Sequence, residues 1–157
     1  MKIYIFGMFI LFSLTSGYAN GQTKPDTLKY CVKESVGVGG FDPVTYWQGR
    51  PKAGNPAFAT EFEGVIYRFF SIENQKKFKV DPIKYLPQFG GWCSMTLAMG
   101  RATTPTYDNF VVFKNKLYLF ERTVSMNGRE LWLSDPKNHE KTASKNYFLY
   151  STTGKIK

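Results

Sequence analysis

Two cysteines are the residues of this chain best suited to chemistry. Cys93 follows Gly90, Gly91 and Trp92, and a helix that begins near Trp92 would place it in the first turn, where the helix dipole favours the thiolate. This position predicts a ligand-binding or redox thiol. Two other interpretations stay open. Cys93 is a small buried apolar residue, or it forms a disulfide with Cys31, which an oxidising compartment allows.

Three sulfur side chains in one short segment, those of Cys93, Met95 and Met99, suggest a soft metal site. Thiolate and thioether sulfur suit copper(I), and thiolate also suits zinc. On a helix, however, Met95 and Met99 share a face, whereas Cys93 and Met95 point away from each other. The alternative is that the methionines fill the core beneath the hairpins. Copper or zinc therefore stays a hypothesis without a complete ligand set.

The remaining polar residues give no pattern that is typical of an enzyme. His139 is the only histidine, so a hydrolytic triad has few ways to be built. Asp81 and Asp135 each precede a proline, as helix caps do. No pair of carboxylates has a spacing that points to acid–base catalysis. Nothing in the sequence calls for a catalytic function.

The charge and composition limit the kinds of partner that the protein can have. The 157 residues carry a formal net charge of +9, and the lysines are scattered, as on solvated faces of helices and hairpins. Such a charge also favours association with an anionic surface, such as a membrane or a polyanion. No motif of a nucleic-acid reader is present, so nucleic acid is not an expected partner. We expect a monomer that binds a small ligand or a metal ion.

The N-terminus predicts a secretory signal. Lys2 precedes an almost unbroken apolar run over 3–14, followed by the small residues of a cleavage site. The run is shorter than the roughly 20 apolar residues of a membrane-spanning helix, although an uncleaved anchor stays open as an alternative. We predict a signal peptide over 1–19 and a flexible polar leader over 20–38. The protein is then exported, either periplasmic or secreted, and is not an integral membrane protein.

A repeated pattern predicts the elements that position these residues. In each copy an aromatic strand is followed by a helix and then by Asp-Pro, at Asp81-Pro82 and at Asp135-Pro136. The predicted hairpins pair 57–62 with 65–70, and 109–113 with 116–120. The sequence therefore predicts an α+β fold, in which small antiparallel hairpins pack with short helices and two similar strand–helix–Asp-Pro units are present.

Short helices are expected beside the hairpins. Ser71 is a good N-cap for the first helix, and further helices are predicted over 92–99 and 125–133. We place a single domain at 39–145. The C-terminal tail over 146–157 either packs on this domain or frays.

Three separated motifs have the order seen in one known family. They are Gly40-Phe41-Asp42-Pro43-Val44-Thr45-Tyr46, then Tyr67, Ser71, Phe78, Asp81-Pro82 and Tyr85, and then Gln88-Phe89-Gly90-Gly91-Trp92-Cys93. Over about Gly39 to Lys145 the chain resembles exported, stand-alone YHS domain proteins. The resemblance implies a small exported α+β domain and singles out the segment that ends at Cys93. It also implies metal binding, with copper suggested for related modules.

The metal ligands of related YHS modules are replaced in this chain. The resemblance places their two cysteines at Phe70 and Asn74, and Arg68 stands where the family name calls for histidine. Phenylalanine has no lone pair for a metal, and asparagine is a poor ligand for copper(I) or zinc. We therefore predict a non-catalytic binding or accessory module with its site near Cys93 and the glycine pair at Gly90. A thiol-based redox protein that uses Cys93, and a structural envelope-interaction domain with a basic aromatic surface, stay open as alternatives.

Overall fold

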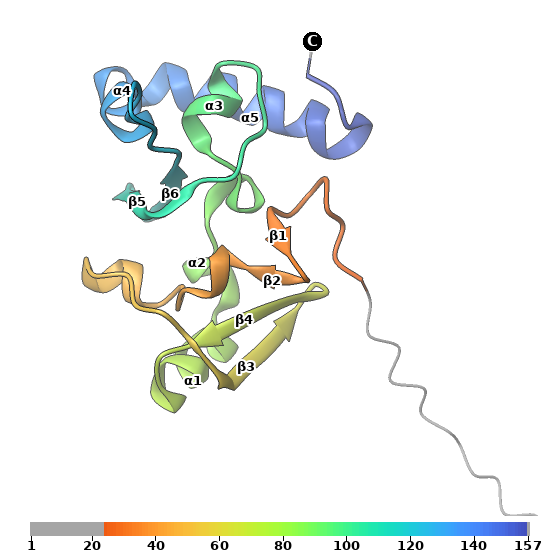
Figure 1. Cartoon of the computed structure of the whole chain (residues 1–157), viewed down its shortest axis with the longest axis vertical. Helices are drawn as coiled ribbons and strands as arrows, with labels where there is room; N and C mark the ends of the chain where they lie inside the picture. Colours follow the sequence, from red (N-terminus) through yellow and green to blue (C-terminus); the bar gives the residue numbers. More distant parts are fainter. Residues whose placement is uncertain (1–23, 157) are drawn as a thin grey trace, which may run out of the picture.

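Residues 24–156 are described by a computed structural model, which has the predicted α+β architecture (Figure 1). Two similar halves follow one another along the chain, and the N-terminal segment over 24–37 lies between them. The predicted signal peptide falls outside the described residues. Among those residues, no helix has the length and apolar character needed to cross a bilayer.

The first half is a hairpin packed with short helices. Its elements are η1 (Val38–Gly40), η2 (Thr45–Gln48), β3 (Asn55–Phe62), β4 (Val65–Phe69), α1 (Ile72–Val80) and α2 (Pro82–Tyr85). The buried face of β4 carries Val65, Tyr67 and Phe69, as the alternation of a strand dictates. These side chains form one apolar cluster with Phe78 of α1. Ser71 caps α1, as predicted, by accepting a backbone N–H of the first turn.

The second half repeats this arrangement. Its elements are η3 (Gln88–Gly91), α3 (Ser94–Ala98), β5 (Thr106–Phe113), β6 (Lys116–Phe120), α4 (Gly128–Ser134) and α5 (Pro136–Thr153). Trp132 of α4 is fully buried and packs on Tyr118 and Phe120 of β6. Asp81 and Asp135 cap α2 and α5, each with proline at the start of the helix. The predicted strand–helix–Asp-Pro units are therefore present.

The two halves match over a longer stretch than the sequence pattern indicated. Both hairpins contain the same irregularity, a bulge near the start of the first strand. Counterparts in the hairpins lie 51 positions apart, as Asn55 and Thr106 do. The same spacing relates the segment 39–42 to the segment 90–93. The repeat thus begins ahead of the hairpin, at a pair of glycines.

The N-terminal segment extends the first sheet. β1 (Val32–Lys33) and β2 (Val36–Gly37) give this sheet the order β1-β2-β4-β3, whereas β5 and β6 form a separate sheet. The only parallel pair among the described strands is β2 with β4. The flexible leader predicted over 20–38 is corrected for its described part, 24–38, because Tyr30, Cys31 and Val38 are buried core residues.

Of the two alternatives for the C-terminal tail, packing is confirmed over the described residues, whereas the predicted domain boundary at 145 is wrong. Helix α5 spans 18 residues without a break and passes the predicted domain boundary. Its buried residues are Ala143 and Asn146, and the Asn146 Nδ2 donates to the Leu97 carbonyl of α3 at 2.7 Å. Tyr147 and Tyr150 of α5 also pack, on Phe89 and Trp92. The packed positions 143, 146, 147 and 150 therefore follow the helical period, with one small and one polar residue among them.

Candidate functional site

Asp42 is the central buried polar residue of the first half. Its side chain is fully buried. Oδ1 accepts the Val44 N–H at 2.8 Å, and Oδ2 accepts the Phe70 N–H at 2.8 Å and the Asn74 Nδ2 at 2.7 Å. Since three donors satisfy one carboxylate, Asp42 joins the end of β4, helix α1 and the segment before η2.

Phe70 and Asn74 do not form a pair of facing donors. The Asn74 amide is buried and bound to Asp42, whereas the Phe70 side chain is 52% exposed. The Lys52 ammonium lies 4.2 Å from the centre of the Phe70 ring. One position therefore serves the core and the other faces solvent, so the two side chains lie in different environments.

Cys93 takes the place of Asp42 in the second half. It is fully buried, and its sulfur accepts the Glu121 N–H at 3.1 Å and the Thr96 N–H at 3.4 Å. Glu121 follows Phe70 by the same 51 positions that separate Cys93 from Asp42. Cys93 is also the N-cap of α3, one residue before the helix begins. The structure thus gives Cys93 a role as a buried hydrogen-bond acceptor, which agrees with the alternative that Cys93 is a small buried residue. A ligand or redox role for Cys93 stays a prediction.

The Gly90-Gly91-Trp92 motif holds the N-terminal segment in place. The Gly90 carbonyl accepts the Cys31 N–H at 2.9 Å, and the Trp92 indole Nε1 donates to the Leu28 carbonyl at 3.1 Å. Gly90 has a φ of +60°, and a Cβ there would lie 1.8 Å from the Lys29 carbonyl oxygen. Only glycine fits this position. The motif that the sequence marked as a candidate site is therefore a docking point for the chain itself.

The disulfide that stayed open as an alternative is not formed, because Cys31 and Cys93 are both free thiols. Met95 is buried, as Cys93 is, whereas Met99 is 48% exposed, so the three sulfur side chains do not share one environment. Within residues 24–156, no three side chains of His, Cys, Asp or Glu are grouped so that they could hold a metal.

Cys31 borders a cavity. The cavity has a volume of about 450 Å³. Its lining consists of Cys31, Val32, Lys33, Gly39, Thr104 and Tyr107. These residues come from the N-terminal segment and from both halves, so the cavity lies where the three parts meet. The Cys31 sulfur is 3.8 Å from the Thr104 hydroxyl oxygen.

The polar groups in this cavity are mostly uncharged at neutral pH. Burial raises the pKa of the Cys31 thiol, and the hydrogen bond with Thr104 opposes that rise. Burial also raises the pKa of the Tyr107 phenol, with a smaller contribution from Cys31. The thiol and the phenol can therefore act as neutral hydrogen-bonding groups. Lys33 is the one charged residue in this lining.

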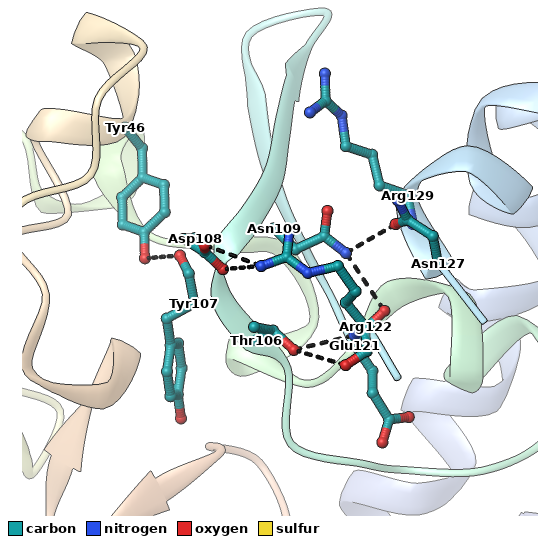
Figure 2. A network of polar contacts seen from close by, with 9 residues as sticks. All are labelled: Tyr46, Thr106, Tyr107, Asp108, Asn109, Glu121, Arg122, Asn127 and Arg129. Atoms are coloured by element: carbon teal, nitrogen blue, oxygen red, sulfur yellow. Dashed lines mark hydrogen bonds and ion pairs between the residues drawn. The ribbon is translucent and has the colours of Figure 1, made fainter. Parts of the chain in front are cut away.

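Two contacts set the position of Tyr107. A Cβ on Gly39, whose φ is +57°, would lie 2.3 Å from the Tyr107 ring, so this glycine makes room for the ring. The Tyr46 hydroxyl donates to the Tyr107 carbonyl at 2.7 Å and joins the first half to β5 (Figure 2). In the same network, the Arg122 Nη2 lies 2.9 Å from both carboxylate oxygens of Asp108. These bonds fix the strand that carries Tyr107.

A second pocket, of about 260 Å³, lies beside Gly90. Its polar side chains already bind one another. The Lys29 ammonium lies 2.7 Å from the Glu63 carboxylate, which also accepts the Tyr30 hydroxyl. The Tyr147 hydroxyl donates to the Lys29 carbonyl at 3.0 Å. Because these groups attach the N-terminal segment to its neighbours, this pocket is a weaker candidate than the cavity beside Cys31.

Comparison with known proteins identifies no relative: no protein-family model matches the chain, and no curated protein or solved structure gives a significant match. The resemblance to YHS domain proteins therefore stays an expectation from the sequence motifs.

Lys33, Thr104 and Tyr107 are the site residues that the sequence did not indicate, and it indicated Cys31 only as a possible disulfide partner of Cys93. Cys31 lies in a segment that looks like a polar leader, and Thr104 lies in a loop. The one local signal was the mixture of Tyr30, Cys31 and Val32 with polar neighbours, which is compatible with a short strand. The convergence of the four residues depends on contacts between distant segments.

Proposed function

We propose that this protein is an exported, non-catalytic binding module of the YHS type, and that its ligand site is the cavity beside Cys31. The observation that supports the proposal is the cavity itself. Its volume of about 450 Å³ lies within the range of small-molecule sites, which combine apolar walls with a few oriented polar groups. Val32 and the Tyr107 ring favour an apolar ligand body, and the Cys31 thiol and Thr104 hydroxyl can orient it.

The same geometry favours binding over thiol redox chemistry. The thiolate is the reactive form of cysteine, and a raised pKa leaves Cys31 mostly protonated. Cys93 is a poor resolving partner, because its buried sulfur accepts two backbone N–H groups. A redox exchange between them would have to break the hydrogen bonds that cap α3.

A fluorescence titration with N-phenyl-1-naphthylamine tests the site, because this uncharged apolar dye brightens in apolar surroundings. Thr104 is exposed at the edge of the cavity, so Thr104→Trp should leave the core intact and fill the opening. We expect its affinity for the dye to fall about tenfold or more, which corresponds to the loss of about 1.4 kcal/mol.

Thr152→Trp is the matched control, since Thr152 is an exposed residue of α5 outside the cavity lining. It should bind the dye as the unchanged protein does. If Thr104→Trp and Thr152→Trp have the same affinity, the cavity is not the binding site.

A further inference from the structure

A smaller cavity adjoins the one beside Cys31. It has a volume of about 250 Å³ and is lined by Lys33, Glu34, Val36, Gly39 and Arg68. Lys33 and Gly39 belong to the linings of both cavities. The apolar cavity therefore has a charged neighbour along one edge.

Arg68 supplies unused hydrogen-bond donors to this charged cavity. It projects from β4 and is partly buried. Within residues 24–156, its guanidinium forms no ion pair, and neither does the Lys33 ammonium. Arg122 differs from both, because its guanidinium is occupied by Asp108. Arg68 and Lys33 are thus free to bind a group from outside the described chain.

The chemistry of these two side chains selects an anion. A guanidinium presents a planar fork of N–H donors that matches the oxygens of carboxylate, phosphate or sulfonate groups. Glu34 is the one acidic residue in this lining, so two cations stand against one carboxylate. Partial burial of Arg68 strengthens the attraction of its guanidinium for an anion, because the effective dielectric is lower than in water.

The geometry points to an amphipathic organic anion as the ligand, with its apolar body in the cavity beside Cys31 and its anionic group bound by Arg68 and Lys33. This inference rests on the proposed function and adds the chemical class of the ligand. It also gives Arg68 a role as a binding residue at the position where the YHS motif would carry histidine.

A pair of matched dyes tests the inference. 1-Anilinonaphthalene-8-sulfonate has the ring system of N-phenyl-1-naphthylamine with an added sulfonate, so the two dyes separate the anionic contact from the apolar one. In Arg68→Gln, the dissociation constant of the sulfonate dye should rise about tenfold or more, because a charge-assisted contact is lost. In the same variant, the dissociation constant of the uncharged dye should change less than about twofold.

Two further variants keep the test interpretable. Lys33 is exposed, so Lys33→Gln should fold normally. Like Arg68→Gln, it should lower the affinity for the sulfonate dye and not for the uncharged dye. Arg129→Gln is the matched arginine control, because the Arg129 guanidinium points away from the surrounding polar network (Figure 2). It should bind both dyes as the unchanged protein does.

Three outcomes would overturn the inference. One is that Arg68→Gln loses affinity for both dyes equally. Another is that Arg129→Gln loses as much affinity for the sulfonate dye as Arg68→Gln does. The third is unchanged sulfonate binding in both Arg68→Gln and Lys33→Gln. If the uncharged dye is insensitive to Thr104→Trp, the proposed function itself fails, and that result is distinct from the other three.

Discussion

Removing the Asp42 carboxylate should destabilise the protein more than removing the Cys93 sulfur, although the two side chains occupy equivalent places. Asp42→Ala takes away the acceptor of three hydrogen bonds, one of them from the Asn74 amide. Cys93→Ala takes away the acceptor of two, both from backbone N–H groups at longer distances. Both side chains are fully buried, so the orphaned donors are removed from most of the solvent.

The magnitudes follow from the number and kind of these bonds. A hydrogen bond to a charged group contributes about 1.5–3 kcal/mol, and a buried donor left without a partner costs about 1–3 kcal/mol. Allowing for partial solvation beside the exposed Phe70 side chain, we expect Asp42→Ala to lower the free energy of unfolding by about 4 kcal/mol. For Cys93→Ala we expect about 2 kcal/mol, because sulfur is a weak acceptor.

Urea and thermal unfolding followed by circular dichroism measure both changes. At about 2.1 cal/mol/K of unfolding entropy per residue, 4 kcal/mol corresponds to a decrease in Tm of roughly 15 °C for a domain of this size. Asp81→Ala is the control, because Asp81 is an exposed cap that accepts the Lys84 N–H at 3.2 Å. It should cost only about 1 kcal/mol. A cost for Asp42→Ala no larger than that for Asp81→Ala would refute the reasoning, and so would a larger cost for Cys93→Ala than for Asp42→Ala.

Two further predictions concern the N-terminal segment. Gly90→Ala should release this segment, because the new Cβ would lie 1.8 Å from the Lys29 carbonyl oxygen. Trypsin should then cleave the N-terminal segment faster. Gly49→Ala is the control, since no atom lies within 4 Å of its Cβ, and it should leave the cleavage rate unchanged. Native Cys31 should react with iodoacetamide more slowly than a free thiol at pH 7, since burial raises its pKa and thiolate forms only as the pH rises through that raised value. Mass spectrometry of the labelled protein measures this rate, and labelling at the free-thiol rate would contradict the expected burial.

The parts of the fold that depend on neighbouring residues could be predicted. The strand 116–120 was predicted with the bounds that the structure gives to β6, because alternating side chains and a turn are local properties. Asp81 and Asp135 were identified as caps for the same reason. The first three residues of β5, Thr106–Asp108, were missed, since the bulge interrupts the alternation on which the prediction depends.

The sequence by itself determined the α+β class and the two repeated units. Only the tertiary structure decided that Cys31 borders a cavity. Cys93 is enclosed in the core of the second half, where its sulfur accepts the Glu121 N–H. Cys31 reaches the cavity because a segment that lacks a local folding signal packs between the two halves. Burial and convergence are set by contacts between residues far apart in the chain, and a local pattern does not encode them.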